Sequence, residues 1–181
     1  MGDPKKKHKK YKTPESPFDQ TRLTDELGLI GTYGLRNKKE LWRHRTVIRN
    51  FLRIAREMLS MDPEKRATEE NDLRRRMHDL GLVQRDVGLE GVLGLRIEDV
   101  LERRLQTLVH RSGMASSLFQ ARQLITHGHI TIGEREVKSP GHIVTRGEEK
   151  LIRYTPSSPY SAVNHPMRQE LAALEARRQP A

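Results

Sequence analysis

The stretch that decides the fold runs from residue 104 to residue 153 and reads RLQTLVHRSGMASSLFQARQLITHGHITIGEREVKSPGHIVTRGEEKLIR. Its first half carries two helical patterns, and Ser117 with Gln120 predicts a capping box at the start of the second helix. Beyond Gly128 the apolar period shortens toward two, which is typical of strands. The predicted strands cover residues 130–132, 135–137, 142–144 and 151–154, and 146–148 form a loop. We therefore expect a helix pair packed on a small, mostly antiparallel β-sheet.

Upstream of this stretch, the sequence predicts helices. Residues 38–60 have the clearest helical period, with further helices expected over 62–80 and 97–110. Residues 28–34 (GLIGTYG) are predicted to be a loop, because three glycines in seven residues weaken a helix. The apolar face of the 38–60 helix is formed by Leu41, Ile48, Leu52, Ala55 and Leu59. The rest of this helix carries five candidate phosphate-binding residues: Arg43, Arg45, Arg49, Arg53 and Arg56.

The composition points to a polyanionic partner. The 181 residues have a formal net charge of +10 and a pI near 10.1, while only 34% are hydrophobic. A basic protein of this kind favours nucleic acid as its partner. The chain contains no cysteine, which excludes disulfides and thiolate metal ligands and fits a cytoplasmic protein. No stretch approaches the roughly 20 apolar residues that span a bilayer, so no membrane partner is expected.

The expected organisation is an α+β protein with a helical body and an embedded RNA-binding module. Residues 1–36 are predicted to form a basic, extended arm, in which Lys5, Lys6 and Lys7 would neutralise phosphates. Residues 37–103 form the helical body, and residues 104–154 form the module. Residues 155–181 are a tail with a helix from Pro166 onward.

No pattern in the chain indicates catalysis or a resident cofactor. His127, His129 and His142 lack the carboxylate or thiolate neighbours of most metal sites, so no metal ligand is assigned. The serines have no nucleophile-elbow context, and the paired glutamates lie in predicted turns. We expect no enzyme activity, no cofactor and no small-molecule substrate.

The residues favour binding of folded RNA through its shape and backbone. Arg122 and Gln123 lie on a face of the second module helix that the apolar stripe leaves free. Aromatic residues make up only 4% of the chain, which argues against a platform for stacking single-stranded bases. Phosphate contacts would fix the register, while Gln, Ser and Thr could read sugars or base edges.

A family resemblance follows from these residues. The run ARQLI at 121–125, followed by HGHI at 127–130, resembles the RNA-binding module of small-subunit ribosomal protein four. The runs NKKELW at 37–42 and DPEKR at 62–66 resemble the archaeal and eukaryotic branch of that family, as does the segment from 93 to 107. The resemblance covers roughly residues 19–160. The module alone also occurs in unrelated RNA enzymes, whereas the module with these upstream helices is specific.

The resemblance implies a structural constituent of the small ribosomal subunit in the cytoplasm. Such a protein binds the 5′ domain of small-subunit rRNA, nucleates assembly and supports decoding accuracy. Its expected partners are rRNA, neighbouring small-subunit proteins, and messenger RNA near the channel through which it enters. Some bacterial relatives hold zinc through N-terminal cysteines, which this chain lacks. The resemblance implies these RNA contacts in the module: Arg104, Arg111, Ser116, Ser117, Arg122, Gln123 and His127.

Three alternatives share parts of this architecture. A small-subunit biogenesis factor of the small nucleolar ribonucleoprotein type would carry the same helices and module. Pseudouridine synthases and tyrosyl-transfer-RNA synthetases carry the module beside a catalytic domain, and nothing here supplies a catalytic Asp motif or a nucleotide-binding loop. A stress protein that binds stalled large subunits would lack the long helical region upstream.

Overall fold

The computed structural model describes residues 8–85, 87–162 and 164–171 of the chain. Lys5, Lys6 and Lys7, and the part of the predicted tail helix beyond residue 171, lie outside the described residues. Residues 166–171 are helical. The other elements, in chain order, are α1 (Gln20–Tyr33), α2 (Lys38–Leu59), α3 (Pro63–Asp79), α4 (Leu89–Leu93), α5 (Ile97–Glu102), α6 (Leu105–Arg111), α7 (Leu118–Thr126), β1 (Ile130–Ile132), β2 (Arg135–Glu136), α8 (Arg146–Glu149), β3 (Ile152–Tyr154) and η1 (Pro159–Ser161).

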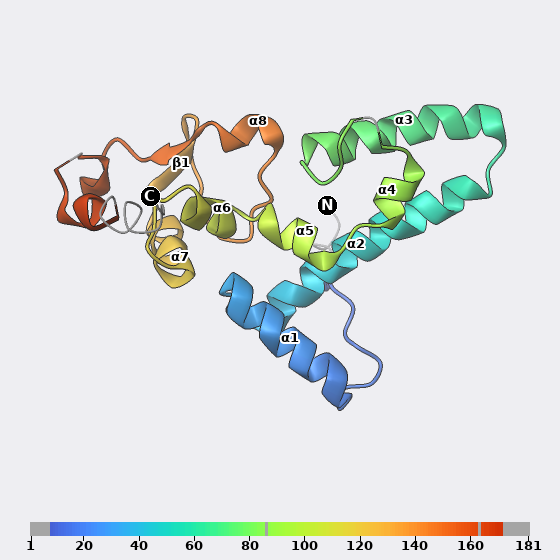
Figure 1. Cartoon of the computed structure of the whole chain (residues 1–181), viewed down its shortest axis with the longest axis horizontal. Coiled ribbons are helices and arrows are strands. Elements are labelled where there is room, and N and C mark those ends of the chain that lie inside the picture. The colour runs from blue at the N-terminus through green and yellow to red at the C-terminus, as the bar shows by residue number, and fades with distance from the viewer. Residues whose placement is uncertain (1–7, 86, 163, 172–181) are drawn as a thin grey trace, which may run out of the picture.

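The chain divides into a part made only of helices and a part that contains the sheet. We call α1–α5 the body and the elements from α6 to β3 the module. In Figure 1 the long helix α2 crosses the body, with α3 above it and α1 below it, and the module lies beside the end of α2 that meets α1. The expected α+β class, with a helical body and a small sheet, is confirmed.

Two apolar clusters hold the body together. One lies where α2 meets α3 and α4, and it buries Ala55, Met58 and Met77. The other joins α1, the start of α2 and α5 through Tyr33, Leu41 and neighbouring apolar residues. The N-cap of α2 is Asn37, whose side chain accepts a hydrogen bond from the Glu40 backbone N–H at 3.1 Å. The long helix contributes residues to both clusters and so links them.

Helix α1 corrects the prediction that residues 1–36 form an extended arm with a loop at 28–34. The helix is capped by Asp19 at its start and by Gly34 in the left-handed conformation at its end. Glu26 is buried against α2, and Tyr33 is buried in the cluster that contains Leu41 and Leu101. The cost of interior glycines is of the order of 1 kcal/mol each, and these caps and buried contacts offset it.

The module has its own core beneath a three-stranded antiparallel sheet of order β2-β1-β3. The predicted strand 130–132 and its turn into β2 are confirmed, with Thr131 opposite Glu136 and Arg153. Helices α6 and α7 cover the sheet, and their buried residues join those of β1 in one cluster. Ser117 caps α7, accepting a hydrogen bond from the Gln120 backbone N–H at 3.2 Å. The Gln120 side chain accepts from the Ser116 backbone N–H rather than from that of Ser117, so only half of the predicted capping box forms.

Three local predictions around the module were wrong. The helix expected over 97–110 breaks at Arg103 and Arg104, because Arg104 is extended and the backbone on either side of it hydrogen-bonds to His142 and Val144 instead. The strand expected at 142–144 is reduced to one bridge between Arg104 and Ile143. The loop expected at 146–148 is the short helix α8, which a Thr145–Glu148 capping box starts.

Candidate nucleic-acid interface

The surface of α7 is the first candidate for RNA contact. Residues 103–133 contain no Asp or Glu, although the chain has 24 of them. On α7, Ala121, Leu124 and Ile125 turn inward, whereas Gln123 is exposed. An anionic partner therefore meets no repelling side chain from this stretch.

Glu40 joins the body to the module through two arginines. Its carboxylate accepts hydrogen bonds from Arg122 Nη1 and Nη2 at 3.1 and 2.7 Å, and from Arg104 Nη2 at 3.0 Å. Arg104 begins α6 and Arg122 lies on α7, so one side chain of α2 holds both module helices. Two positive charges share one negative charge, which leaves this cluster with a net charge of +1.

Arg104, which was predicted to contact RNA, lies inside this cluster. Its side chain is 0% exposed, so RNA cannot reach it in this structure. Within the described residues, Nε and Nη1 of Arg104 have no hydrogen-bond partner, so Glu40 is its main compensation. Arg122 is mostly buried and pairs with Glu40, so it holds the module against α2.

The pKa of Glu40 reflects this position. Burial pushes the pKa of its carboxyl upward, but the hydrogen bond from Arg122 and the charge of Arg104 outweigh burial and leave the pKa lowered. The carboxylate therefore stays charged at neutral pH. Glu40 is a fixed anion that both arginines need.

The remaining module residues predicted to bind RNA differ in how available they are. Arg111 is exposed but forms a forked pair with Glu102, at 2.8 and 2.6 Å. Ser116 donates its hydroxyl to Gln120 Oε1 at 2.7 Å, and Ser117 serves as the α7 cap. His127 is exposed at the end of α7. Gln123 and His127 are thus the freest members of the predicted set.

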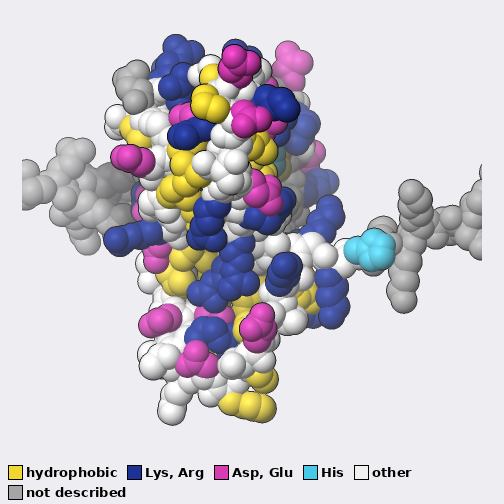
Figure 2. Space-filling model, turned by 90° about the vertical axis from the view of Figure 1, so that its right-hand side faces the viewer, with side chains coloured by type: hydrophobic (Ala, Val, Ile, Leu, Met, Phe, Trp, Pro, Cys, Tyr) yellow, Lys and Arg dark blue, Asp and Glu magenta, His cyan; other side chains and the backbone are white. Residues whose placement is uncertain are grey.

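The five arginines of α2 separate into two groups. Arg45 pairs with Glu26 and Arg53 pairs with Glu57, while Arg43, Arg49 and Arg56 are exposed and form no ion pair with any described residue. Arg49 and Arg56 are seven residues apart, which is two helical turns and places them on one face. Figure 2 shows Lys and Arg side chains gathered across the middle of the side of the body where α2 turns into α3.

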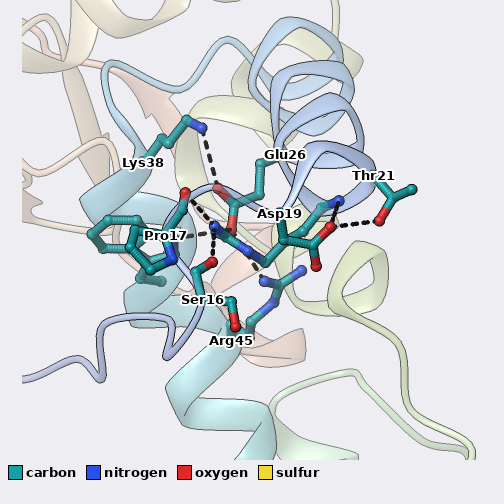
Figure 3. Close-up of polar contacts among 9 residues, drawn as sticks. Ser16, Pro17, Asp19, Thr21, Glu26, Lys38 and Arg45 are labelled. Carbon is teal, nitrogen blue, oxygen red and sulfur yellow. Dashed lines mark hydrogen bonds and ion pairs between the residues drawn. The ribbon is translucent and has the colours of Figure 1, made fainter.

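Glu26 explains why Arg45 is not free. This carboxylate is 0% exposed and lies between Arg22, Lys38 and Arg45, with the Trp42 indole N–H donating to it at 3.1 Å (Figure 3). Burial raises its pKa, but the hydrogen bonds from Trp42 and Arg22 prevail and lower it. This cluster fastens α1 to α2, so Arg45 has a structural partner that the sequence did not reveal.

A basic hollow on the body was not predicted from the sequence. It has a volume of about 370 Å³ and is lined mainly by Arg74, Arg75, His78 and Arg85, with Asn71 and Asp79. The run of three arginines at 74–76 was the available signal. The helical period of residues 62–80 gives no sign that Arg85, beyond the end of that helix, completes the same hollow.

His44 is a further buried polar residue that the apolar pattern of α2 did not indicate. It is 7% exposed and lies on the core face of α2. Leu59 was expected on that face but is exposed. Burial, followed by the positive charge of Arg104, lowers the pKa of His44 to about 4, and the charge of Glu40 opposes this only partly. His44 is therefore neutral in the folded chain at neutral pH.

The neutral state of His44 makes stability depend on pH. Below its ordinary pKa of about 6.5 the unfolded chain binds a proton that the folded chain does not, so acid favours unfolding. We expect the free energy of unfolding to fall by about 3 kcal/mol between pH 6.5 and pH 4 from this group. Urea unfolding at a series of pH values measures it.

The control for this prediction is a pair of histidine variants. His44→Leu should abolish most of the loss between pH 6.5 and 4, whereas His127→Gln, which removes an exposed histidine, should leave it in place. The lowered pKa values of Glu26 and Glu40 remove stability only as pH falls below about 4.5. If the free energy of unfolding of His44→Leu depended on pH as it does in wild type, His44 would not be the cause of the loss.

Neither a metal-holding cluster nor a membrane-spanning helix is found in the described residues. They contain no group of three or more His, Cys, Asp or Glu side chains placed to hold a metal ion. In the same part of the chain, no helix is long and apolar enough to cross a membrane.

Comparison with known proteins finds similarity over most of the chain. A family model for the S4 domain matches residues 103–150. Small ribosomal subunit protein uS4 of Ignicoccus hospitalis is 51% identical over 160 residues, covering 88% of this chain and 96% of that protein. The proteins of the same name from Sulfurisphaera tokodaii and Sulfolobus acidocaldarius are 48% and 47% identical, covering 94% and 97% of this chain and 96% and 100% of those proteins.

Proposed function

This chain belongs to the family of small ribosomal subunit protein uS4, and on that basis we propose that it is a structural component of the small ribosomal subunit that binds rRNA without catalysis. These archaeal relatives fall within the archaeal and eukaryotic branch that the motifs indicated. The observation that carries the proposal is the combination of an S4 domain with identity over nearly the whole length of the relatives.

The geometry supports RNA binding by two separate surfaces. The exposed side of α7 offers Gln123 and neighbouring polar groups in a stretch without carboxylates. The exposed side of α2 offers Arg49 and Arg56, two cations that no described carboxylate neutralises. Because Glu40 ties α2 to the module, the two surfaces are held in a fixed relation and can engage one folded RNA together.

The finer role follows the family. The RNA is the 5′ domain of small-subunit rRNA, bound early in assembly, and the mature position supports decoding accuracy beside the path of messenger RNA. Neighbouring small-subunit proteins are further partners, and the site of action is the ribosome in the cytoplasm. The protein works without a cofactor or small-molecule substrate.

A biogenesis factor is not favoured, because the relatives with near-complete coverage are named as subunit proteins. The distinction is one of residence. A structural component stays in the mature subunit, whereas an assembly factor leaves with the precursor.

Fractionation of a native lysate on a sucrose gradient containing salt tests the proposal. Each fraction is probed for this protein and for mature and precursor small-subunit rRNA. We expect stable comigration with mature small subunits. Residence only in lighter precursor particles would support the biogenesis alternative, and a pool free of RNA would contradict both.

The α2 surface makes a specific prediction about charge. Arg49→Gln combined with Arg56→Gln should weaken binding of a 5′-domain rRNA fragment by roughly tenfold or more, because each free cation contributes a phosphate contact. Fluorescence anisotropy measures the affinity. Arg53→Gln is the matched control on the same helix, and its effect should be smaller because Arg53 is already paired with Glu57. Equal losses from the paired and free arginines would argue against direct contact.

A further inference from the structure

Phe119 is an aromatic side chain that lies outside the core of the module. It lies in the first turn of α7 and is 70% exposed, while Ala121, Leu124 and Ile125 complete the core beneath the helix. Its position falls outside the apolar stripe of α7, so its ring stands on the solvent side. A single exposed apolar residue is ordinary on a protein surface, and what distinguishes Phe119 is its surroundings.

The neighbours of Phe119 within residues 103–133 are polar and include no carboxylate. Gln123 follows one turn later on the same side of α7, and side chains four residues apart on a helix are neighbours. Its side-chain amide makes no hydrogen bond to the described residues and is exposed. Ser116 precedes the ring by three residues and is also exposed. The exposed ring of Phe119 and the exposed amide of Gln123 therefore lie side by side in the stretch without carboxylates.

The surroundings favour RNA over a protein partner. A protein docking surface is built from contiguous apolar area, and Phe119 is the only large exposed hydrophobic residue of α6, α7 and β1. The others in the described part of the chain are Phe18, Leu27, Leu59, Met61, Val87 and Leu151. A lone ring beside hydrogen-bonding groups is instead the arrangement by which proteins hold a base that has left a helix.

We infer that Phe119 and Gln123 form a recognition site for one unpaired nucleobase of the bound RNA. The phenyl ring stacks on the face of the base, and the Gln123 amide, which has two donors and one acceptor oxygen, hydrogen-bonds to its edge. The site deepens the proposed function and rests on it. It also modifies the expectation that the RNA is bound only through its shape and backbone. Aromatic residues at 4% of the chain are too few to stack several bases, but one ring suffices for one base.

Stacking and charge contribute to RNA affinity in ways that its salt dependence can separate. Stacking on one aromatic ring adds a contact that involves no phosphate, so its removal lowers affinity without changing the salt dependence. Phe119→Ala should therefore weaken binding of the 5′-domain rRNA fragment by roughly 5- to 150-fold at every salt concentration. Phe119→Tyr and Phe119→Trp, which keep a flat ring, should retain most of the affinity.

Anisotropy titrations of six proteins test this: wild type, Phe119→Ala, Phe119→Tyr, Gln123→Ala, the double variant Phe119→Ala with Gln123→Ala, and Phe18→Ala. Phe18 is 91% exposed and precedes α1, so its removal is the matched control for the loss of an exposed ring. Phe119→Ala and Gln123→Ala should both weaken binding, and Phe18→Ala should not. The double variant should lose less binding free energy than the sum of the losses in Phe119→Ala and Gln123→Ala, because the two groups hold the same base.

Three outcomes would overturn the inference. Phe119→Ala could bind the RNA as tightly as Phe18→Ala does, or its loss of affinity could vanish as salt is raised. Alternatively, the variant could fail to bind a neighbouring subunit protein while keeping its RNA affinity. Failure of the proposed function is a different result, because wild type itself would then bind the 5′-domain fragment no better than a length-matched RNA of another origin. Phe119→Tyr guards against a folding defect, since it alters the exposed ring least.

Discussion

Raising the salt concentration from about 50 mM to 200 mM is expected to weaken binding of the 5′-domain rRNA fragment by roughly 10³- to 10⁵-fold, as for a protein that neutralises about six to ten phosphates. The reason is that each cation placed against a phosphate releases condensed counterions, and added salt opposes their release. The net charge of +10 and the free arginines of α2 supply the cations.

The slope of log affinity against log salt is the quantity to measure. Arg49→Gln combined with Arg56→Gln should make the slope shallower by about 2, because two phosphates are then no longer neutralised. Phe119→Ala should leave the slope unchanged and shift the whole line. A wild-type slope that corresponds to fewer than about two phosphates would contradict an account based on charge.

Glu40→Ala is expected to lower the free energy of unfolding by about 3–5 kcal/mol, because it strands a fully buried arginine without its counter-charge. Arg104 has no other ion pair among the described residues, and two of its nitrogens, Nε and Nη1, already lack acceptors. Since whole domains are stable by about 5–15 kcal/mol, a loss of this size is a large share of the total. Urea unfolding followed by circular dichroism measures it.

Two comparisons isolate the buried charge as the cause. Glu57→Ala breaks an exposed pair with Arg53 on the same helix and should cost less than about 1 kcal/mol. Glu40→Ala in an Arg104→Met background should cost much less than in wild type, because no buried charge is then stranded. A loss that is the same in both backgrounds would mean that Glu40 acts by some route other than pairing with Arg104.

The elements of the fold that could be predicted were those whose signals are local. The cap at Ser117, the period of α2 and the turn from β1 to β2 each lie within a few neighbouring residues, and the structure confirms them. Helix α1 could not be predicted in this way. Local glycines argued against it, while the contacts that stabilise it reach Trp42 and Arg45 on another helix.

The same limit applies to the candidate site. In the sequence, Arg104 resembles a basic surface residue, because its partner Glu40 lies 64 positions earlier. His44 could not be placed in the core, because a polar residue interrupts an apolar pattern and its burial depends on the packing of the body around it. Phe119 could have been noticed, since its position already falls outside the apolar stripe of α7. A helical wheel separates core from surface, and it says nothing about which surface charges are already paired.

Competition binding at physiological salt tests the central claim most directly. The labelled RNA is a transcript of the 5′ domain of small-subunit rRNA, and the competitor is a large-subunit rRNA transcript of equal length and charge. The account predicts that the small-subunit transcript binds at least about 100-fold more tightly, because specific contacts add to the charge attraction that both RNAs share. Equal affinity for the two transcripts would contradict it, since the chain would then be a basic protein without a chosen RNA.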